Sequence, residues 1–319
     1  MRSIQGTPIT NSGIRAGGQA LTIDEVISRI PEWTGATVAV SALGGGITNL
    51  NYRVDVNGKS FVVRMPGKDS ELLGIDRRRE YACTLVAGEG GVGPEVAHFL
   101  ESDGILITHF IAGRGMSAEE ISRPAALRRV AAALRRYHAG PRFPDSFSAL
   151  ETVRDYLRIS RSGAPLPSTI DRMVERAETI DGAMRALPPP PRPCHNDLLL
   201  GNFLDDGQRI RIVDWEYAAM GDPFFDLGNF AAHLSLSDDQ ETVLLDAYLG
   251  QAPAPEVARL KLMKILSDLR EAMWAMVQVT ISTLDYDFVA YGQKHFDRYA
   301  AQLEDSRLPH WLADVARKS

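Results

Sequence analysis

Three side chains with oxygen donors lie close together in a part of the chain that is otherwise turn-rich and apolar. This part reads "CHNDLLLGNFLDDGQRIRIVDWEYA", residues 194–218, and the three are Asp197, Asn202 and Asp214. Burying a carboxylate beside apolar surface is costly unless a cation or hydrogen-bond donors satisfy it. The chain therefore needs a cation or a set of donors at this place.

The order and spacing of these residues are those of an enzyme that catalyses phosphoryl transfer. Asp197 is followed by four residues and then by Asn202, as in the Asp-x-x-x-x-Asn of a kinase catalytic loop, and "RIRIVDWE" supplies a short strand that ends at Asp214. Mg²⁺ prefers carboxylate and amide oxygens, so we expect Asn202 and Asp214 to be metal ligands. Asp197 is then left to accept the proton of an attacking hydroxyl. Within this catalytic loop, we expect His195 to orient its neighbours through hydrogen bonds rather than to transfer protons.

A triphosphate also needs groups that bind phosphate, and the first part of the chain offers them. The glycines of "LGGGITNLNYRV" allow backbone N–H groups to approach phosphate oxygens closely. Arg64 stands near the end of "KSFVVRM", where kinases usually place a lysine that pairs with the α- and β-phosphates. Glu80, in the following helix, is the expected ion-pair partner of Arg64. The alternative for Glu80 is a solvated carboxylate on a helix face.

Two kinds of element must position these residues. Between residues 36 and 108, short segments rich in β-branched and aromatic residues predict a small antiparallel sheet, with a hairpin turn at "NGK" and one helix in "SELLGIDRRREYACTLVAGEG". After "IAGRGM", the segments carry one apolar stripe at helical spacing. The predicted fold class is therefore α+β, with a small N-terminal sheet plus helix and a larger, mainly helical C-terminal lobe.

The expected domain organisation follows from these changes in pattern. We expect a disordered start over residues 1–20, a nucleotide-binding lobe over 21–108, a hinge over 109–115 and a helical lobe over 116–319. The segment "LPPPPRP", residues 187–193, cannot continue a helix, so the chain should run extended there. His195 should then follow a stiff, extended segment.

Bulk composition excludes several classes of protein. The net charge of −6 and pI of about 5.7 argue against binding to nucleic acid or to an anionic membrane. Two cysteines, Cys83 and Cys194, make a disulfide framework improbable and favour a reducing compartment. The start lacks the apolar core of a signal peptide, and no apolar run is long enough to cross a bilayer. The expectation is a cytoplasmic protein without membrane insertion. Its oligomeric state is left open, with a homodimer as one option.

With these residues assembled, the chain resembles the choline/ethanolamine kinase family within the aminoglycoside phosphotransferase and protein-kinase-like group. The matches extend over about residues 36 to 305 and include "GGGITNLNYRV", "FVVRMPG", "CHNDLLLGNFL" and "VDWEYAAMGDPFFDLGNF". Arg64 in the lysine position, "DWEY" after the metal strand and the C-terminal "WAMVQ…YGQKHFDRY" point to the amino-alcohol branch. The resemblance implies a two-lobed kinase-like fold, ATP and Mg²⁺ as cofactors, and a small amino-alcohol substrate, with choline as the leading one.

The resemblance also implies roles for residues outside the catalytic loop. Those expected at the nucleotide are Thr48, Asn49, Thr108, His109 and Ile111. Those expected around the amino alcohol are the aromatic residues Tyr217, Trp274, Tyr286 and Tyr291, with Phe224 or Phe225 as a further member, and the carboxylates Glu216 and Glu271. Asp226 is expected to hold the catalytic loop without touching substrate. A trimethylammonium group has no N–H to donate, so it is best held by π faces, at about 0.5–2 kcal/mol per ring.

Read without the resemblance, Trp274, Tyr286 and Tyr291 are ordinary aromatic residues of a helical core. Glu271 departs from the family pattern, because choline kinases carry a second tryptophan three residues before the one that matches Trp274. A carboxylate accepts hydrogen bonds that a primary amine donates and choline does not, which favours ethanolamine or a methylated intermediate. Alternatively, Glu271 forms a salt bridge within the helical bundle, with Arg270 or Lys264.

Two further alternatives remain open. The first keeps the chemistry and changes the acceptor to an aminoglycoside, methylthioribose or thiamine, each of which needs polar groups where this chain offers aromatic residues. The second is a pseudokinase-like module that binds nucleotide or amine without turnover. The intact set of Asp197, Asn202 and Asp214 argues against that module.

Overall fold

The computed structural model describes residues 13–14, 20–44, 49–67 and 69–317, and they divide into two compact units. The first unit ends at Ser70 and resumes for Val96–Phe110, whereas the second holds Glu71–Glu95 and the chain from Ile111 onward. The boundary after Phe110 falls inside the segment that the sequence predicts to be a hinge.

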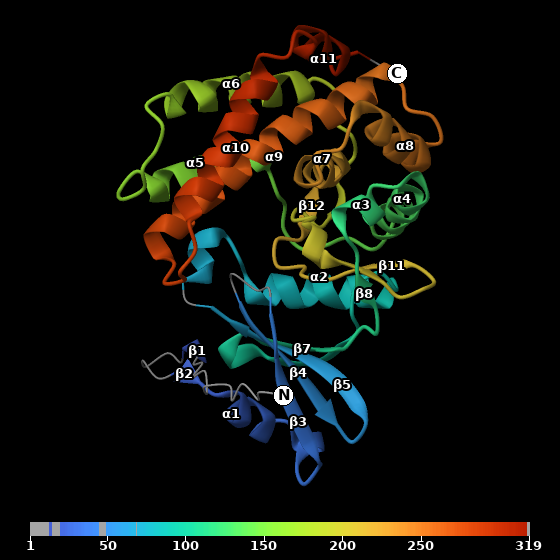
Figure 1. The fold of residues 1–319 in the computed structure, drawn as a ribbon, viewed down its shortest axis with the longest axis vertical. Coiled ribbons are helices and arrows are strands. Elements are labelled where there is room, and N and C mark those ends of the chain that lie inside the picture. The colour runs from blue at the N-terminus through green and yellow to red at the C-terminus, as the bar shows by residue number, and fades with distance from the viewer. Residues whose placement is uncertain (1–12, 15–19, 45–48, 68, 318–319) are drawn as a thin grey trace, which may run out of the picture. The chain divides into compact units, whose positions relative to one another are not determined.

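The first unit contains a five-stranded antiparallel sheet in the order β3-β4-β5-β7-β6 (Figure 1). Its strands are β3 (Val38–Leu43), β4 (Asn49–Val56), β5 (Lys59–Pro66), β6 (Val96–Leu100) and β7 (Ile105–His109). β4 and β5 form a hairpin whose turn residues Asn57 and Gly58 have φ values of 49° and 80°, as a type I′ turn requires. The predicted strands and hairpin are confirmed.

One face of this sheet is covered by a short N-terminal segment. The helix α1 (Ile23–Ser28) and the 3₁₀ turn Pro31–Trp33 contribute Val26 and Trp33 to a core with the buried strand residues Val54 and Val63. The sequence does not predict α1, because six residues show too little periodicity. Of the expected disordered start, the structure describes only the paired strands β1 (Gly13–Ile14) and β2 (Ala20–Leu21).

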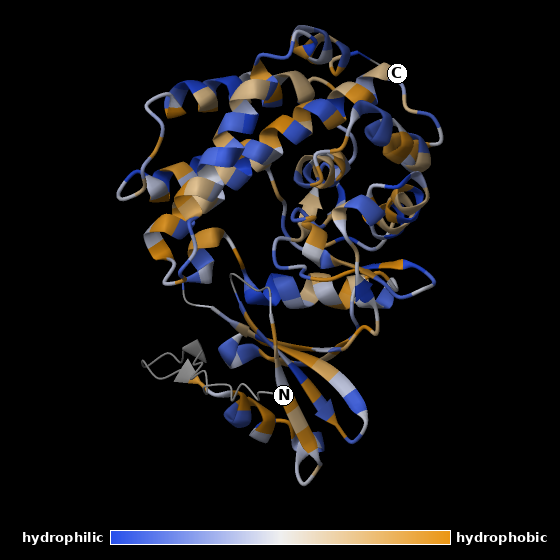
Figure 2. Cartoon of the chain, viewed as in Figure 1, coloured by the Kyte–Doolittle hydropathy of each residue, from blue (hydrophilic) through white to orange (hydrophobic). Residues whose placement is uncertain are grey.

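The second unit is mainly helical (Figure 1). Its helices are α2 (Arg77–Glu89), α3 (Ala118–Ile121), α4 (Pro124–His138), α5 (Ala149–Ser160), α6 (Ile170–Met184), α7 (Pro223–His233), α8 (Asp238–Leu249), α9 (Ala254–Ile281), α10 (Phe288–Leu303) and α11 (Leu308–Asp314). α4 buries Leu127, Val130 and Leu134 on one face, and Figure 2 shows hydrophilic and hydrophobic residues along the same helices. The predicted helical part is confirmed, and so is the α+β fold class.

Helix α9 is the central element of this unit. It packs against α5, α7, α10 and α11, so its middle part is covered on all sides. The covered part includes polar residues, among them Asp268, Arg270 and Glu271, each no more than 3% exposed. Buried charges of this kind need partners, and those partners determine how the site is built.

The sequence places residues 71–95 in the N-terminal lobe, whereas the structure groups them with the helical unit. The thiol of Cys83 lies 3.4 Å from the carbonyl oxygen of Ala218, and the N–H of Ile212 donates to the carbonyl of Val92 at 3.0 Å. These bonds attach α2 and the glycine turn after it to the strands of the second unit. The other lobe boundaries stay predictions.

Two small sheets hold the loops that carry the candidate site. β9 (Arg192–Cys194) pairs with β12 (Ala219–Gly221), and β10 (Phe203–Asp205) lies between β11 (Ile210–Ile212) and β8 (Arg114–Gly115). All of these pairings are antiparallel. The segments between the strands, residues 195–202 and 213–218, are thereby fixed at both ends.

Helix α7 is absent from the sequence prediction for a physical reason. Nearly all of its residues are buried, including Asp226 and Asn229, so it has no polar face and no amphipathic period. Its Gly228 lies against the backbone of α9, where an added Cβ would meet Lys264 N at 2.7 Å and Met263 C at 2.8 Å. In the part of the chain that the structure describes, no helix has both the length and the apolar character needed to cross a membrane.

This close approach predicts that Gly228→Ala destabilises the protein although alanine favours helices. Overpacking against rigid backbone should cost about 1–3 kcal/mol in the free energy of unfolding, measured by urea titration. The matched control is Gly182→Ala in α6, where nothing lies within 4 Å of the added Cβ and a gain of about 0.5–1 kcal/mol is expected. Equal effects of the two substitutions would contradict the packing account.

Candidate active site

The carboxylate of Asp226 holds the start of the catalytic loop. Its two oxygens accept the backbone N–H groups of His195 at 2.8 Å and of Asn196 at 2.7 Å. Tyr137 donates its hydroxyl to the same carboxylate, and His138 Nε2 lies 3.0 Å from it. Burial opposes a charge here, yet these hydrogen bonds keep the pKa of Asp226 below its ordinary value. The position of Asp226 is the one expected of a loop-holding residue.

His195 is fully buried and both of its ring nitrogens are used within the protein. Nε2 lies 3.0 Å from the carbonyl oxygen of Val213, and Nδ1 accepts the N–H of Asp197 at 3.2 Å. These contacts assign the ring proton to Nε2. The geometry suits a residue that orients the loop.

A second polar residue of α7 supports the loop further along. Asn229 Oδ1 accepts the N–H of Leu198 at 2.6 Å, while its amide group donates to Ser267 of α9 at 3.0 Å. Asn229 was not among the residues predicted from the sequence. Its spacing from Asp226, three residues on one helix face, was the available signal.

Asp197 is 8% exposed, and its carboxylate oxygen Oδ1 lies 3.1 Å from Nη1 of Arg270. Burial is the main reason that the pKa of Asp197 is raised to about 7; the charge of Arg270 opposes the shift, and Glu271 and Asp214 add to it. The group is therefore poised to exchange a proton near neutral pH. Arg270 is a neighbour of Asp197 that the sequence analysis did not foresee.

Asn202 belongs to the catalytic loop, and the residue before Asp214 is bonded to it. The amide group of Asn202 donates to the carbonyl of Asp197 at 2.9 Å, so its Oδ1 is the atom suited to a metal. The carbonyl of Asn202 accepts the N–H of Val213 at 3.0 Å, which ties the loop to the residue before Asp214. Asp214 has a φ of 71°, a left-handed conformation that is strained for most side chains and is common at functional sites.

Three carboxylates converge around Asp214. Oxygen atoms of Glu80, Asp214 and Glu216 lie within 4.8 Å of one another, and Nη1 of Arg77 contacts Glu80 at 2.7 Å and Glu216 at 3.2 Å. A set of hard oxygen donors at this spacing fits a divalent cation such as Mg²⁺. From the sequence, Glu216 is expected to contact the substrate; in the structure its carboxylate lies beside the expected metal ligand Asp214.

The predicted aromatic residues Tyr217, Trp274 and Tyr291 lie together. Trp274 donates its Nε1–H to the hydroxyl of Tyr217 at 3.1 Å, and its ring centroid is 6.1 Å from that of Tyr291. Phe288, not foreseen, is 5.9 Å from Trp274. Tyr286 lies further out, 47% exposed, with its ring 6.1 Å from Tyr291.

One face of the Tyr217 ring is already covered by a cation. The guanidinium carbon of Arg270 lies 4.6 Å from the centre of the Tyr217 ring. The same guanidinium contacts Glu271 at 3.0 Å, so the ion pair that the sequence leaves open for Glu271 is present. Lys264, the other candidate, pairs instead with Glu241 at 2.6 Å.

Glu271 has two more neighbours, from α10 and α7. Tyr291 donates its hydroxyl to Oε1 at 2.7 Å, and His233 Nε2 lies 3.9 Å from Oε2. Burial works against the charge of Glu271, yet the charge of Arg270 and the hydrogen bond from Tyr291 help to keep its pKa below the ordinary value. Burial lowers the pKa of His233 from 6.5 to about 4, so this imidazole is neutral at pH 7.

The expected nucleotide residues fall on both units. Asn49 begins β4 and is buried, Arg64 lies on β5 opposite Leu106, and Thr108 and His109 end β7. Ile111 is in the other unit, and Thr48 lies outside the described residues. The pairing of Arg64 with Glu80 would join the two units and stays a prediction.

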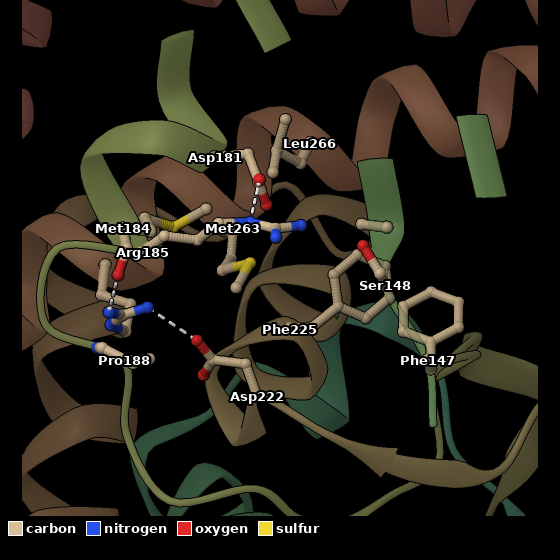
Figure 3. A pocket seen from close by; sticks show the side chains of 12 residues that line it. Phe147, Ser148, Asp181, Met184, Arg185, Pro188, Asp222, Phe225, Met263 and Leu266 are labelled. Carbon is tan, nitrogen blue, oxygen red and sulfur yellow. Dashed lines mark hydrogen bonds and ion pairs between the residues drawn. The ribbon is translucent and has the colours of Figure 1, made fainter. Parts of the chain in front are cut away.

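Phe225 does not join the aromatic set described above but lines a different hollow of the helical unit. This cavity has a volume of about 160 Å³ and is lined by residues that include Phe147, Met184, Phe225 and Met263 (Figure 3). The charged side chains at its wall are paired, with Arg185 bonded to Asp181 and Arg259 bonded to Asp222. Its lining includes none of the residues expected to do chemistry.

Known proteins are similar to this chain in both sequence and fold. The model of the phosphotransferase enzyme family matches residues 39–261. A choline/ethanolamine kinase family protein from Mesorhizobium loti is 35% identical, with 92% of this chain and 98% of that protein covered and a TM-score of 0.80. Probable ethanolamine kinase A from Dictyostelium discoideum is 25% identical over 309 residues, 85% of this chain and 88% of its own length. Choline kinase LicA from Streptococcus pneumoniae, 22% identical over 88% of this chain and 98% of its own, has a TM-score of 0.76 and supports the kinase-like fold.

The neutral state of buried His233 predicts a specific dependence of stability on pH. The unfolded chain binds a proton at this residue below pH 6.5 and the folded chain only near pH 4, so the free energy of unfolding should fall as the pH falls from 6.5 towards 4. His233→Gln removes this contribution. Between pH 7 and pH 4.5, urea unfolding should show the stability difference moving in favour of the variant by about 2 kcal/mol. A difference that is constant with pH would show that His233 is not held neutral.

Proposed function

This chain belongs to the phosphotransferase enzyme family and, within it, to the choline/ethanolamine kinase family, and from that premise we propose that it transfers the γ-phosphoryl group of ATP to the hydroxyl of a small amino alcohol. The observation that carries the proposal is the arrangement of Asp197: a buried carboxylate on a loop fixed by Asp226, paired with Arg270 and adjoined by the amide of Asn202.

Asp197 is the proposed general base. It accepts or orients the proton of the acceptor hydroxyl, and a pKa of about 7 leaves a substantial fraction ionised at neutral pH. Arg270 stabilises the charged form through its contact of 3.1 Å. His195 has the proposed role of a positioning residue, because its nitrogens bond to the loop itself.

Asn202 and Asp214 are the proposed ligands of Mg²⁺. The convergence of Asp214 with Glu216 and Glu80 supports a divalent cation at this place, and makes Glu216 a proposed ligand as well. When bound, the ion would neutralise phosphate charge and hold the triphosphate in position.

The nucleotide itself is assigned from the resemblance. Arg64 would pair with the phosphates and be held by Glu80, Thr48 and Asn49 would lie at the phosphate loop, and the segment from Thr108 to Ile111 would bind adenine through its backbone. Asn49 and Thr108 are only 6% and 8% exposed, so both residues are held in place by the sheet of the first unit.

The acceptor is proposed to be an amino alcohol of the choline and ethanolamine type. The aromatic residues Tyr217, Trp274 and Tyr291 suit choline, whereas the carboxylate of Glu271 suits an amine with N–H donors. An aminoglycoside, methylthioribose or thiamine would need more polar partners than this set of residues provides. A binding module without turnover is disfavoured, because it would have no need for a base held as Asp197 is.

The proposal predicts that Asp197→Asn loses phosphoryl transfer while the protein still binds nucleotide. Loss of a general base typically lowers the rate about 10²- to 10⁴-fold, and the isosteric amide keeps the local packing. Product formation with ATP, Mg²⁺ and a panel of amino alcohols measures the rate, and a fluorescent ATP analogue measures binding. The matched control is Asp239→Asn, an exposed aspartate on α8. Full activity of Asp197→Asn would remove the mechanism.

A further inference from the structure

Glu271 shares the guanidinium that it contacts with a second carboxylate. Glu271 and Asp197 are both buried carboxylates, and the single guanidinium of Arg270 lies between them, bonded to one oxygen of each. His233 is neutral at pH 7. The next ionisable groups on α9 and α10 pair with one another, since Asp268 contacts His295 at 2.8 Å and Arg298 at 3.2 Å. A ligand that brings one positive charge would balance the pair of carboxylates.

The same place holds donors and acceptors without protein partners. Within the described residues, Nε and Nη2 of Arg270 and Nε2 of His233 are buried and make no hydrogen bond. A buried polar atom left in this state costs about 1–3 kcal/mol, and native proteins rarely leave several together. A ligand with both a hydrogen-bond donor and an oxygen acceptor would satisfy them.

One face of the Tyr217 ring is not open to a quaternary ammonium. Arg270 covers the ring of Tyr217 at 4.6 Å from its centre, in the geometry of a cation–π contact. The guanidinium is held there by Asp197 and Glu271. A trimethylated head group brings no N–H donor, so it could neither bond to Glu271 nor replace what Arg270 donates.

On the premise of the proposed function, we propose that the acceptor is an alcohol that carries a primary amine. Glu271 and the neutral imidazole of His233 accept hydrogen bonds from its ammonium group, and Arg270 excludes a trimethylated head group from the face of Tyr217. The hydroxyl lies between Asp197, which receives its proton, and the unpaired N–H groups of Arg270. This assignment gives each of the unsatisfied groups a partner and balances the two carboxylates with two cations.

Tyr291 fixes the carboxylate in this arrangement. Its hydroxyl donates to Oε1 of Glu271 at 2.7 Å and so sets the plane in which the remaining lone pairs point. Trp274 and Phe288 then contribute apolar walls around the carbon atoms of a short chain. The specificity therefore depends on hydrogen bonds to the amine, with the aromatic residues in a supporting role.

A methylation series tests the proposal directly. Ethanolamine, its N-methyl and N,N-dimethyl derivatives and choline offer three, two, one and no N–H donors in the same size range. With the full-length protein, ATP and Mg²⁺, kcat/KM should fall along the series, and choline should be about ten- to a hundredfold poorer than ethanolamine, as expected for loss of charged hydrogen bonds. Choline equal to or better than ethanolamine would overturn the inference while leaving the proposed function intact. Failure to phosphorylate any of the four would instead overturn the proposed function.

Two variants assign the selectivity to the residues named. Glu271→Gln should raise KM for ethanolamine about tenfold or more with little change in kcat, and should leave the weaker reaction with choline almost unchanged. Arg270→Leu, which uncovers Tyr217, should lower the ratio of ethanolamine to choline efficiency. The matched control is Glu256→Gln near the start of α9, with unchanged selectivity. Equal losses on both amines in Glu271→Gln would show a purely structural role and overturn the proposal.

Discussion

The hydrogen bonds to the buried carboxylate of Asp226 are the interaction on which the rest of the site depends. Two backbone N–H groups at the start of the catalytic loop donate hydrogen bonds to this side chain, and side chains of α4 bond to it as well. A buried charge is stable only when such donors surround it. The loop that carries Asp197 is therefore held in place by the helical unit, and not only by contacts within its own leucine-rich sequence.

A second constraint comes from α9, which is buried along its middle and still carries charged residues. Arg270 is stable there because it contacts both Asp197 and Glu271, and Glu271 also accepts the hydroxyl of Tyr291. The helix thus connects the proposed base with the proposed amine site through one guanidinium. Phosphoryl transfer needs the acceptor hydroxyl and the base to be aligned. Under the proposed function, this connection would align the two ends of a short amino alcohol at once.

Much of the fold and part of the site could be predicted from the sequence, for identifiable reasons. The strands, the Asn57–Gly58 hairpin and the amphipathic helices follow from local periodicity and turn chemistry, and the order of Asp197, Asn202 and Asp214 marks the loop. The role of Arg270 could not be predicted, because only packing decides which face of a fully buried helix meets the loop. Helix α7, which carries Asn229 and His233, was missed because nearly all of its residues are buried and show no amphipathic period. The expectation that Glu216 contacts the substrate stays a prediction, and the structure places its carboxylate beside Asp214.

The most direct test of this account is the effect of Asp226→Asn on loop protection and on phosphoryl transfer. The account predicts that the amide hydrogens of His195 and Asn196 exchange faster with solvent and that the rate of phosphoryl transfer falls by at least about a hundredfold, since small misplacements of a base are costly. The helical unit should remain folded. Protected amides at both positions with a rate within about tenfold of the wild type would contradict the claim that Asp226 positions the catalytic loop.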